Sequence, residues 1–330
     1  MSTHMKSTHT NTRQSGTALL SVLLLSAVMA VLAMAMLDDI RFGLRRAGNA
    51  QAMTQAQHYA LGTEALARAR IDELARTGAD TAQWSGKPLL FPIEAGLIRA
   101  SLRDASACFN LNSVVQGAPE QWQRRELGVR QYVALLQALQ FPAAQAQALA
   151  DTLVDWIDSD SDRSPLGAED ASYAVQTLAY RTAATLLAEP SELRAIRGYD
   201  ADVYVRLREY VCALPVAELS PVNINALRPE QAPLLSMLTL GATTPGEATR
   251  ILAARPAGGW HDATAFWAHP ALAGAGVPNE VYDQMELRSR WFALDSEVEY
   301  AGAQVTLSAL LQLDASGSAH LRARRWTAEE

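Results

Sequence analysis

The chain has 330 residues, of which 49% are hydrophobic and 19% charged, and this is enough apolar material for two domains that each bury a core. Its formal net charge is −7 at pH 7, and an acidic chain is a poor partner for nucleic acid. No Gly-x-Ser-x-Gly nucleophile motif occurs, and His58, His261, His269 and His320 are scattered along the sequence. We therefore expect that the protein is not an enzyme.

The first predicted element is an apolar helix near the N-terminus. Residues 17–37 carry no charge, and as a helix they would extend about 31 Å, enough to cross a bilayer core of about 30 Å. Lys6 and Arg13 precede this run and two aspartates follow it, so the positive-inside rule places residues 1–16 in the cytoplasm. The sequence predicts a single crossing of the inner (cytoplasmic) membrane, with the chain after residue 37 on its outer side.

The boundary between the polar leader and the apolar run is Gly16. A secretory signal peptide would have a shorter apolar core with its cleavage site on the far side, and a plain signal anchor gives no reason for a glycine at this boundary. The segment Gln14-Ser15-Gly16, followed by Thr17-Ala-Leu-Leu, resembles the type IV prepilin leader, which a membrane prepilin peptidase cuts after glycine. The resemblance implies cleavage after Gly16 and N-methylation of the Thr17 amine.

The fifth position after this cut is Ser21, where major pilins and pseudopilins carry a glutamate. A carboxylate in hydrocarbon is costly unless a neighbouring subunit partners it, so a subunit that lacks it fits the end of a fibre. The residues thus resemble minor pseudopilin K of type II secretion, a family of large tip subunits that typically lacks this glutamate. The ordinary alternative is a membrane anchor that contains a serine.

The helical pattern continues beyond the apolar run. From residue 50 to 75 apolar side chains recur at three-to-four spacing with charged residues mostly between them, and Thr77-Gly78 ends the pattern. One helix from Thr17 to this point would be close to 90 Å long, half in lipid and half on a soluble domain, as in a pilin. We expect residues 38–78 to form its periplasmic part.

Strand patterns occur in two places that are far apart in the sequence. Alternating apolar and polar side chains occupy residues 97–103 and three runs near the C-terminus, 291–300, 304–311 and 320–326. Short turns at residues 301–302 and 315–317 separate the last three runs. We expect all four to be antiparallel neighbours in one sheet that packs on the long helix, in a domain made of residues 79–112 and 287–330.

The residues between these strands, 113–286, are predicted to form a helical insertion. Runs with helical periodicity lie at residues 131–140, 143–157, 177–188, 191–197, 201–209, 229–237, 247–254 and 262–267. The expected fold class is α+β: a pilin-like long N-terminal helix packed on an antiparallel β-sheet, with a large all-α domain inserted between strands.

Two segments echo each other, Phe109-Asn-Leu-Asn-Ser-Val and Val222-Asn-Ile-Asn-Ala-Leu. Each is predicted to be an extended piece that ends in an asparagine able to cap a helix. Both match the pseudopilin K family, as do residues 174–178, Tyr180-Arg181 and residues 190–194. The resemblance therefore covers nearly all of the chain that follows the leader.

Residues from about 220 to 270 also resemble a helix-hairpin-helix module, which in other proteins holds DNA phosphate. Such a hairpin needs a Gly-x-Gly-like turn, whereas this chain has Leu240-Gly-Ala-Thr-Thr-Pro, and only Arg228, Arg250 and Arg255 are basic nearby. We therefore expect a packing scaffold and no nucleic-acid partner. A membrane-anchored periplasmic binding module of helix-hairpin-helix type is the alternative function.

The chemically densest segment is the acidic run that begins with Asp-Trp-Ile-Asp. Counting Asp158 as position one puts Asp160 at three and Glu169 at twelve, which is the carboxylate spacing of a calcium loop. Position six is Arg163, where the standard loop needs glycine, although Gly167 can provide a turn. The family resemblance implies calcium near this segment, and a solvated acidic loop is the alternative. The candidate ligands are Asp155, Asp158, Asp160, Asp162, Glu169 and Asp170.

The two cysteines, Cys108 and Cys212, lie in the part of the chain expected outside the cytoplasmic membrane, where they can form one disulfide. Closing a loop of about 100 residues would stabilise the fold by up to about 4.7 kcal/mol in the chain-entropy model. Two buried free thiols are the alternative.

The family resemblance implies a mechanical role. A type K minor pseudopilin would cap the tip of the periplasmic pseudopilus in a type II secretion system and serve the export of folded proteins across the outer membrane. The implied partners are minor pseudopilins of types I and J, the major pseudopilin, the prepilin peptidase and the inner-membrane assembly platform.

Overall fold

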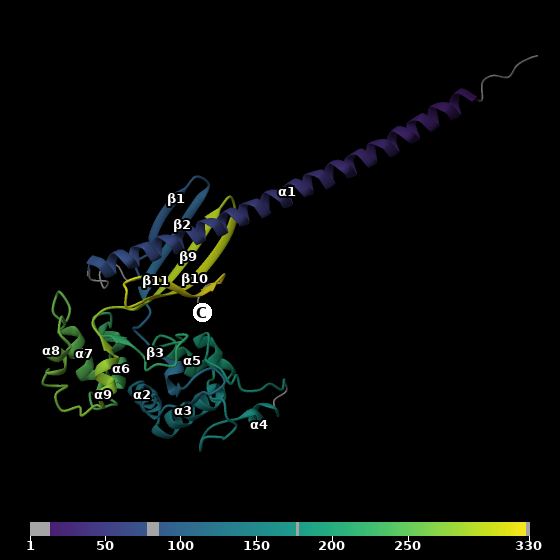
Figure 1. The fold of residues 1–330 in the computed structure, drawn as a ribbon. Helices are drawn as coiled ribbons and strands as arrows, with labels where there is room; N and C mark the ends of the chain where they lie inside the picture. Colours follow the sequence, from purple (N-terminus) through teal and green to yellow (C-terminus); the bar gives the residue numbers. More distant parts are fainter. Residues whose placement is uncertain (1–13, 78–85, 176–177, 328–330) are drawn as a thin grey trace, which may run out of the picture.

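The computed structural model describes residues 14–77, 86–175 and 178–327. Its first element is one helix, α1 (Gln14–Thr77), which extends far beyond the folded body (Figure 1). At about 1.5 Å per residue its 64 residues span about 96 Å. The prediction of one continuous helix through the apolar run and the soluble part is confirmed, whereas residues 1–13 of the predicted leader lie outside the described residues.

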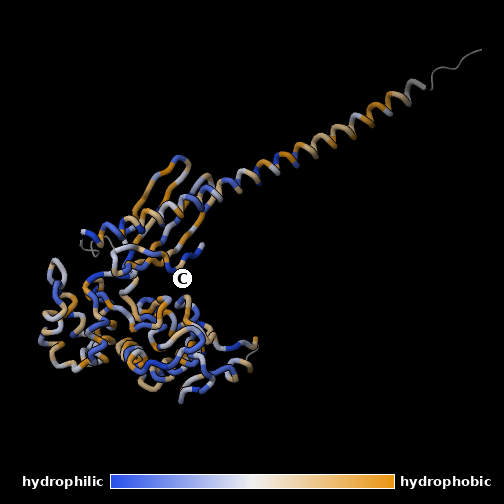
Figure 2. The backbone as a smooth tube through the Cα atoms, in the orientation of Figure 1, coloured by the Kyte–Doolittle hydropathy of each residue, from blue (hydrophilic) through white to orange (hydrophobic). Residues whose placement is uncertain are grey.

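The two halves of α1 have different surroundings. Residues 17–51 are exposed on all sides, and the hydropathy colours in Figure 2 show that hydrophobic residues prevail in the part of the helix that is far from the body. From Ala52 onward a stripe of small and aliphatic side chains is buried, and Ala56, Ala60 and Ile71 have no exposed surface. Their helical spacing keeps them on one face. The first half therefore has the surface of a membrane-crossing helix, and the second half packs on protein.

The second half of α1 lies on one face of a five-stranded antiparallel sheet with the strand order β1-β2-β9-β10-β11. The strands are β1 (Leu89–Ile93), β2 (Gly96–Asp104), β9 (Trp291–Tyr300), β10 (Ala303–Leu313) and β11 (Ala319–Arg325). Strand β2 pairs directly with β9 although the whole insertion separates them in sequence. The insertion therefore leaves the sheet after Asp104 and returns before Trp291 (Figure 1).

Two glycine turns join the C-terminal strands where the sequence predicts them. Ala301 and Gly302 connect β9 to β10, and Gly317 lies in the turn between β10 and β11. The two glycines have φ of 83° and 84°, a left-handed conformation that glycine adopts without steric cost.

The edge strand β1 is absent from the sequence prediction. Its run Leu89-Leu-Phe-Pro-Ile contains Pro92, which has no N–H to donate to a strand ladder. Strand β1 pairs only with β2 and lies at the edge of the sheet, where proline is tolerated. Leu89 and Leu90 are exposed at this edge.

The sheet residues that face α1 form an apolar core with it. Phe292, Leu294, Leu307 and Leu311 are buried in this cluster. A hydrogen bond also joins the start of β11 to α1, where the N–H of Ala319 donates to the Asp72 carboxylate at 2.7 Å. The expected packing of one sheet face on the long helix is confirmed.

The insertion folds as a second body, the α-domain, with one extended hydrophobic core. Its helices are α2 (Glu126–Ala138), α3 (Ala143–Ile157), α4 (Asp170–Tyr173), α5 (Ala201–Leu207), α6 (Ala232–Leu238), α7 (Pro245–Ala253), α8 (Ala263–Trp267) and α9 (Asn279–Gln284). Three short 3-10 segments accompany them, η1 (Leu111–Val114), η2 (Pro190–Ala195) and η3 (Pro229–Gln231). The predicted fold class is confirmed.

Short strands make the insertion mostly rather than wholly helical. They pair as β3 (Phe109–Asn110) with β6 (Val211–Cys212), β4 (Val115–Gln116) with β5 (Gln123–Arg124), and β7 (Val222–Asn223) with β8 (Met285–Glu286). The prediction of an all-α insertion is wrong in this respect, because these two-residue strands are too short for their alternation to be recognised in sequence.

The prediction of a helix at residues 177–188 is also wrong. Residue 177 lies outside the described residues, and residues 178–189 contain no helix. Their backbone N–H groups bond to distant partners instead: those of Ala183 and Ala184 donate to the carbonyl of Trp156, and that of Thr182 donates to Asp170. These tertiary hydrogen bonds replace the internal ladder that a helix would use.

The two Asn-x-Asn segments start two halves of the α-domain in the same way. The Asn110 side chain accepts the N–H of Asn112 at 3.2 Å and caps η1, and the Asn223 side chain accepts the N–H of Asn225 at 3.0 Å. The second asparagine of each segment then binds backbone groups of distant loops. Each segment also pairs in parallel with the last strand of its half. Each Asn-x-Asn segment therefore links the beginning of its half to the end of the same half.

Candidate functional site

The predicted processing site lies at the exposed end of α1. Gly16 and Thr17 are both helical, and α1 is the one helix among the described residues that is long and apolar enough to cross a membrane. The Ser21 hydroxyl donates to the carbonyl oxygen of Thr17 at 2.8 Å. Since this hydroxyl is satisfied within its own helix, it does not need a partner from a neighbouring subunit.

The acidic loop lies at the C-terminal end of α3. Asp158 caps this helix, and the chain runs through Asp160 to Glu169, the residue before α4. Carboxylate oxygens of Asp158, Asp160 and Glu169 lie within 4.8 Å of one another. The structure thus brings together three of the six predicted ligands, from two loop ends that are eleven residues apart in sequence, counting from Asp158 to Glu169.

These carboxylates repel one another in a poorly solvated site. Burial raises the pKa of Asp158 to about 8, with Asp160, Asp155 and Glu169 adding to the shift. Burial also raises the pKa of Glu169 to about 7, and the charge of Asp155 contributes. Asp158 Oδ1 and Glu169 Oε1 are buried and have no hydrogen-bond partner within the described chain. Two unpartnered buried oxygens beside a third carboxylate fit a hard cation.

Asp155 holds the acidic loop through hydrogen bonds to its backbone. Its two carboxylate oxygens accept the N–H of Ser164 at 3.1 and 3.2 Å, and burial raises its pKa. A Cβ atom on Gly167 would lie 2.0 Å from Asp155 Oδ2, so only glycine allows this approach. The Gly167 N–H also closes a turn onto the Ser164 carbonyl at 3.0 Å. Arg163 does not have a positive φ, so the loop lacks the central turn of a standard EF-hand.

Two further predicted ligands, Asp170 and Asp162, are not members of this group of three carboxylates. Asp170 Oδ1 accepts hydrogen bonds from the backbone N–H and the hydroxyl of Thr182, and its other oxygen lies 3.9 Å from the Arg181 guanidinium. Asp162 is exposed, and its backbone N–H donates to Asp160 Oδ1 at 2.8 Å. Asp170 and Asp162 therefore order the loop through hydrogen bonds in this structure.

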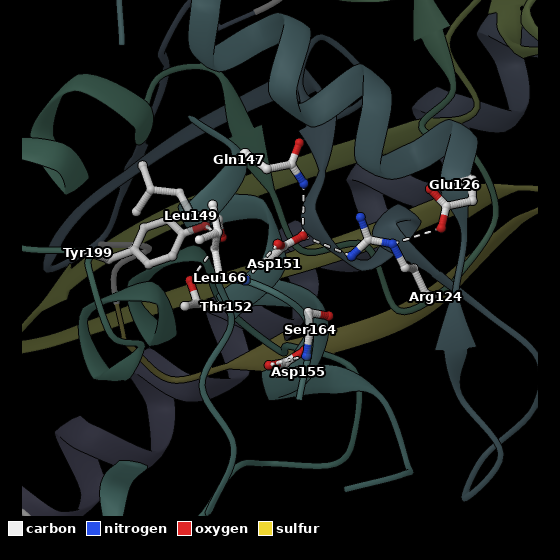
Figure 3. Close-up of polar contacts among 10 residues, drawn as sticks. All are labelled: Arg124, Glu126, Gln147, Leu149, Asp151, Thr152, Asp155, Ser164, Leu166 and Tyr199. Atoms are coloured by element: carbon white, nitrogen blue, oxygen red, sulfur yellow. Dashed lines mark hydrogen bonds and ion pairs between the residues drawn. The ribbon is translucent and has the colours of Figure 1, made fainter. Parts of the chain in front are cut away.

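The sequence prediction missed Asp151, which is buried one helical turn before Asp155. Asp151 Oδ1 accepts hydrogen bonds from Arg124 at 3.0 Å and from Gln147 at 2.9 Å, and its second oxygen accepts the N–H of Leu166 (Figure 3). Asp151 thereby ties α3 to the acidic loop. The available signal was its spacing, since residues at 151, 155 and 158 lie on one face of a helix.

Cys108 and Cys212 form a disulfide, with their Cα atoms 5.8 Å apart and a sequence separation of 104. Cys212 belongs to β6, which pairs with β3 next to Cys108. The bond therefore fastens the strand that ends the first half of the α-domain to the segment that begins it.

The helix-hairpin-helix-like part has its polar groups engaged within the protein. One Arg255 nitrogen donates to the carbonyl oxygens of Ile224, Asn225 and Leu227 at 2.6 to 3.3 Å. The N-terminus of α7, where phosphate would bind, is capped by a reciprocal pair of Thr244 and Glu247. An acidic cap and an internally bound arginine favour the packing scaffold over a phosphate site.

These features together define a class of protein. A helix with an exposed apolar half, packed on an antiparallel sheet that carries a helical domain in its longest connection, defines a pilin-like α+β protein with an added α-domain and a candidate membrane span. Known proteins narrow this class. The family described as "Type II secretion system (T2SS), protein K" matches residues 107–216 and again residues 222–284, which are the two halves of the α-domain.

Relatives and a solved structure agree with this match. The chain is 37% identical to type II secretion system protein K of Aeromonas hydrophila over 72% of its own length and 74% of that protein. It is 38% identical to the protein of the same name from Klebsiella pneumoniae, over 73% of its length and 75% of the relative. The crystal structure of the GspK-GspI-GspJ complex from enterotoxigenic Escherichia coli contains a chain with a TM-score of 0.73 and 30% identity, covering 86% of this chain and 99% of the other.

The chain belongs to the type II secretion system protein K family. It is therefore a component of the machinery that secretes proteins by this system, and the family is a structural class of subunit and not a known class of enzyme.

Proposed function

We propose that this protein is the minor pseudopilin that caps the tip of the periplasmic pseudopilus, which serves the export of folded proteins across the outer membrane. The observation that carries this proposal is Ser21, whose hydroxyl bonds to the carbonyl of Thr17 within the same helix. A subunit in the middle of a fibre has a neighbour above it that can partner a carboxylate at this position. A subunit that needs no such partner suits the end of the fibre, and the α-domain adds bulk at that end.

Its partners in this proposal are minor pseudopilins of types I and J. A structural relative was crystallised in a complex of GspK with GspI and GspJ, which supports this assignment. Contact with the major pseudopilin, the prepilin peptidase and the inner-membrane assembly platform follows from the same role. Residues 17–37 anchor the chain in the inner membrane, and the sheet and α-domain lie in the periplasm.

Processing after Gly16, with methylation of the new Thr17 amine, is part of the proposal, and the intact mass of the purified chain tests it. A mature chain lacks its first sixteen residues and carries one extra methyl group. Gly16→Leu should retain the leader and abolish secretion. Gly62→Leu is the matched control, because Gly62 lies on an exposed face of the same helix where a side chain meets no neighbour. Normal secretion by the Gly16→Leu variant would contradict the proposal.

We further propose that the acidic loop binds calcium through Asp158, Asp160 and Glu169. When bound, the ion would supply the positive charge that these carboxylates lack, while Asp155 and Asp151 hold the loop in place. Calcium at about 100 times its dissociation constant should raise the melting temperature of the α-domain by about 5 to 10 °C over the chelated protein. Asp158→Asn should remove this increase, whereas Asp162→Asn should retain it. An equal melting temperature with calcium and with chelator would contradict the assignment.

A further inference from the structure

The last strand of the sheet ends in two adjacent arginines that reach opposite faces of the sheet. Successive residues of a strand point to opposite sides, and the register assigns the faces here. Arg324 pairs with Ala309, a residue of the core against α1, while Arg325 pairs with Ser308 on the other side. A β-bulge at Leu310 and Leu311 sets this register.

Arg324 binds α1, the stem helix. Its Nε and Nη2 donate to the two carboxylate oxygens of Glu64 on α1 at 2.6 and 2.9 Å, a bidentate pair. The Glu64 side chain is only 6% exposed, and the contact with Glu64 raises the pKa of Arg324. The charged pair therefore fixes the end of β11 to one position along α1.

Arg325 binds the α-domain. Its Nε lies 2.9 Å from Glu189 Oε1, and its Nη2 donates to the carbonyl oxygen of Ala188. The second Glu189 oxygen accepts the Ser191 hydroxyl at 3.0 Å, so the carboxylate is held from both sides. The neighbouring Leu187 is bound through its N–H and carbonyl to the Asn112 side chain in the core of the α-domain.

This contact lies away from the place where the chain passes between the two bodies. The two crossings are joined where the N–H of Ala105 donates to the carbonyl of Trp291, at 2.8 Å. Those crossings leave from β2 and β9, and β11 lies two strands beyond β9, about 10 Å to the side. Between the contacts is a cleft of about 830 Å³, lined on its two sides by residues such as Asp295 and Arg208. Arg325 bridges it.

We propose that Arg324 and Arg325 form a two-sided clamp that sets the angle between the stem helix and the α-domain. Without the clamp, the α-domain would keep the chain crossings and the small apolar cluster beside them, in which Leu214 packs with Trp291 and Ala293, and could pivot there. For the capping role proposed above, on which this functional consequence rests, the clamp would hold the cap in one orientation above the fibre. Both arginines are positioning residues in this account.

Distances between two spin labels in the full-length chain in lipid nanodiscs test the clamp. Val205 on α5 and Gln304 on β10 are exposed and can be replaced by labelled cysteines, since the two native cysteines are in a disulfide. Arg325→Ala removes the contacts to Ala188 and Glu189 and should raise the population of longer distances about tenfold, the effect of losing a charge-assisted hydrogen bond. Arg324→Ala should broaden the same distances to a smaller degree, although Arg324 does not contact the α-domain in the described structure.

Arg322→Ala is the matched control, because Arg322 lies on the same strand and bonds to Gln312. It should leave the distances unchanged. Glu189→Gln provides a second variant, which removes the charge of the partner without touching β11. The double exchange Arg325→Glu with Glu189→Arg should restore a narrow distribution. If Arg325→Ala and Glu189→Gln both match the control, there is no clamp, and an unchanged distribution in Arg324→Ala would remove that residue from it. Secretion does not enter the measurement, so its outcome is independent of the proposed function.

Discussion

Two parts of the molecule, the stem (the second half of α1 with its five-stranded sheet) and the α-domain, differ in the contacts that stabilise each of them internally. In the first, apolar side chains repeat with the period of their helix or strand and meet in one core. In the α-domain, which also has an apolar core, buried Asn112 and half-buried Asn225 bind the backbone of distant loops, and buried Asp151 holds a loop against a helix. Periodic burial of apolar side chains therefore fixes the shape of the stem, whereas specific polar contacts fix the loops of the α-domain.

The largest expected effect tests the apolar core of the stem. Phe292→Ala leaves a cavity between the sheet and α1, because Phe292 is 2% exposed, and should reduce the free energy of unfolding of the helix and sheet by about 4 kcal/mol. Denaturant unfolding of the purified full-length chain measures it. Leu89→Ala, at the exposed edge of the same sheet, should change stability by less than about 0.5 kcal/mol. Similar costs for both would mean that burial does not control this region.

A slightly smaller effect is expected in the α-domain. Asn112→Ala removes three hydrogen bonds to Leu187 and Leu214 and leaves their buried backbone groups unsatisfied, so the α-domain should lose about 3 kcal/mol of stability. Hydrogen exchange should show faster opening of residues 178–189 while the amides of β9 and β10 keep their protection. Asn279→Ala, at the exposed start of α9, is the comparison. Equal loss of protection in the sheet would show that the two bodies unfold as one.

A polar contact in the stem tests whether apolar packing alone stabilises this part of the molecule. Glu64→Gln removes a buried charge opposite Arg324 and should destabilise the helix and sheet by about 2 kcal/mol, since the Arg324 side chain keeps some solvent contact. Glu73→Gln breaks the exposed pair of Arg70 and Glu73 and should cost less than about 0.5 kcal/mol. Thermal melts of both variants measure the difference. A neutral Glu64→Gln would indicate that apolar packing alone positions β11.

The last test is a pH dependence confined to the α-domain. Without calcium, Asp158 and Glu169 bind protons more tightly in the folded chain, at pKa of about 8 and about 7, than in the unfolded chain, at about 4. The folded state then holds more protons, so its stability should fall as pH rises from about 4 to 8. Calcium binds the ionised carboxylates and should flatten or reverse this trend. Melting temperatures at pH 5.5 and 8, with chelator and with calcium, measure it, and stability that rises with pH in chelator would contradict it.

Part of the candidate site follows from sequence spacing. The carboxylates Asp158, Asp160 and Glu169 were predicted together and do lie together, because the loop folds back on α3, where Asp155 and Asp151 bind its backbone. The role of Asp170 could not be foreseen, since it depends on Thr182 in a segment that was expected to be helical. Asp151 was missed because its partner Arg124 precedes α2 and meets α3 only after folding.

The sequence by itself determined the apolar run near the N-terminus, the length of α1, and the four longer strands with their two glycine turns. These features depend on charge, composition and a repeat of neighbouring side chains, all of which are local. Only the tertiary structure decided the edge strand β1, the non-helical course of residues 178–189, the choice among six carboxylates, and the two faces of Arg324 and Arg325. Each of these depends on hydrogen bonds or ion pairs between residues that are distant in sequence, so local periodicity carries no record of them.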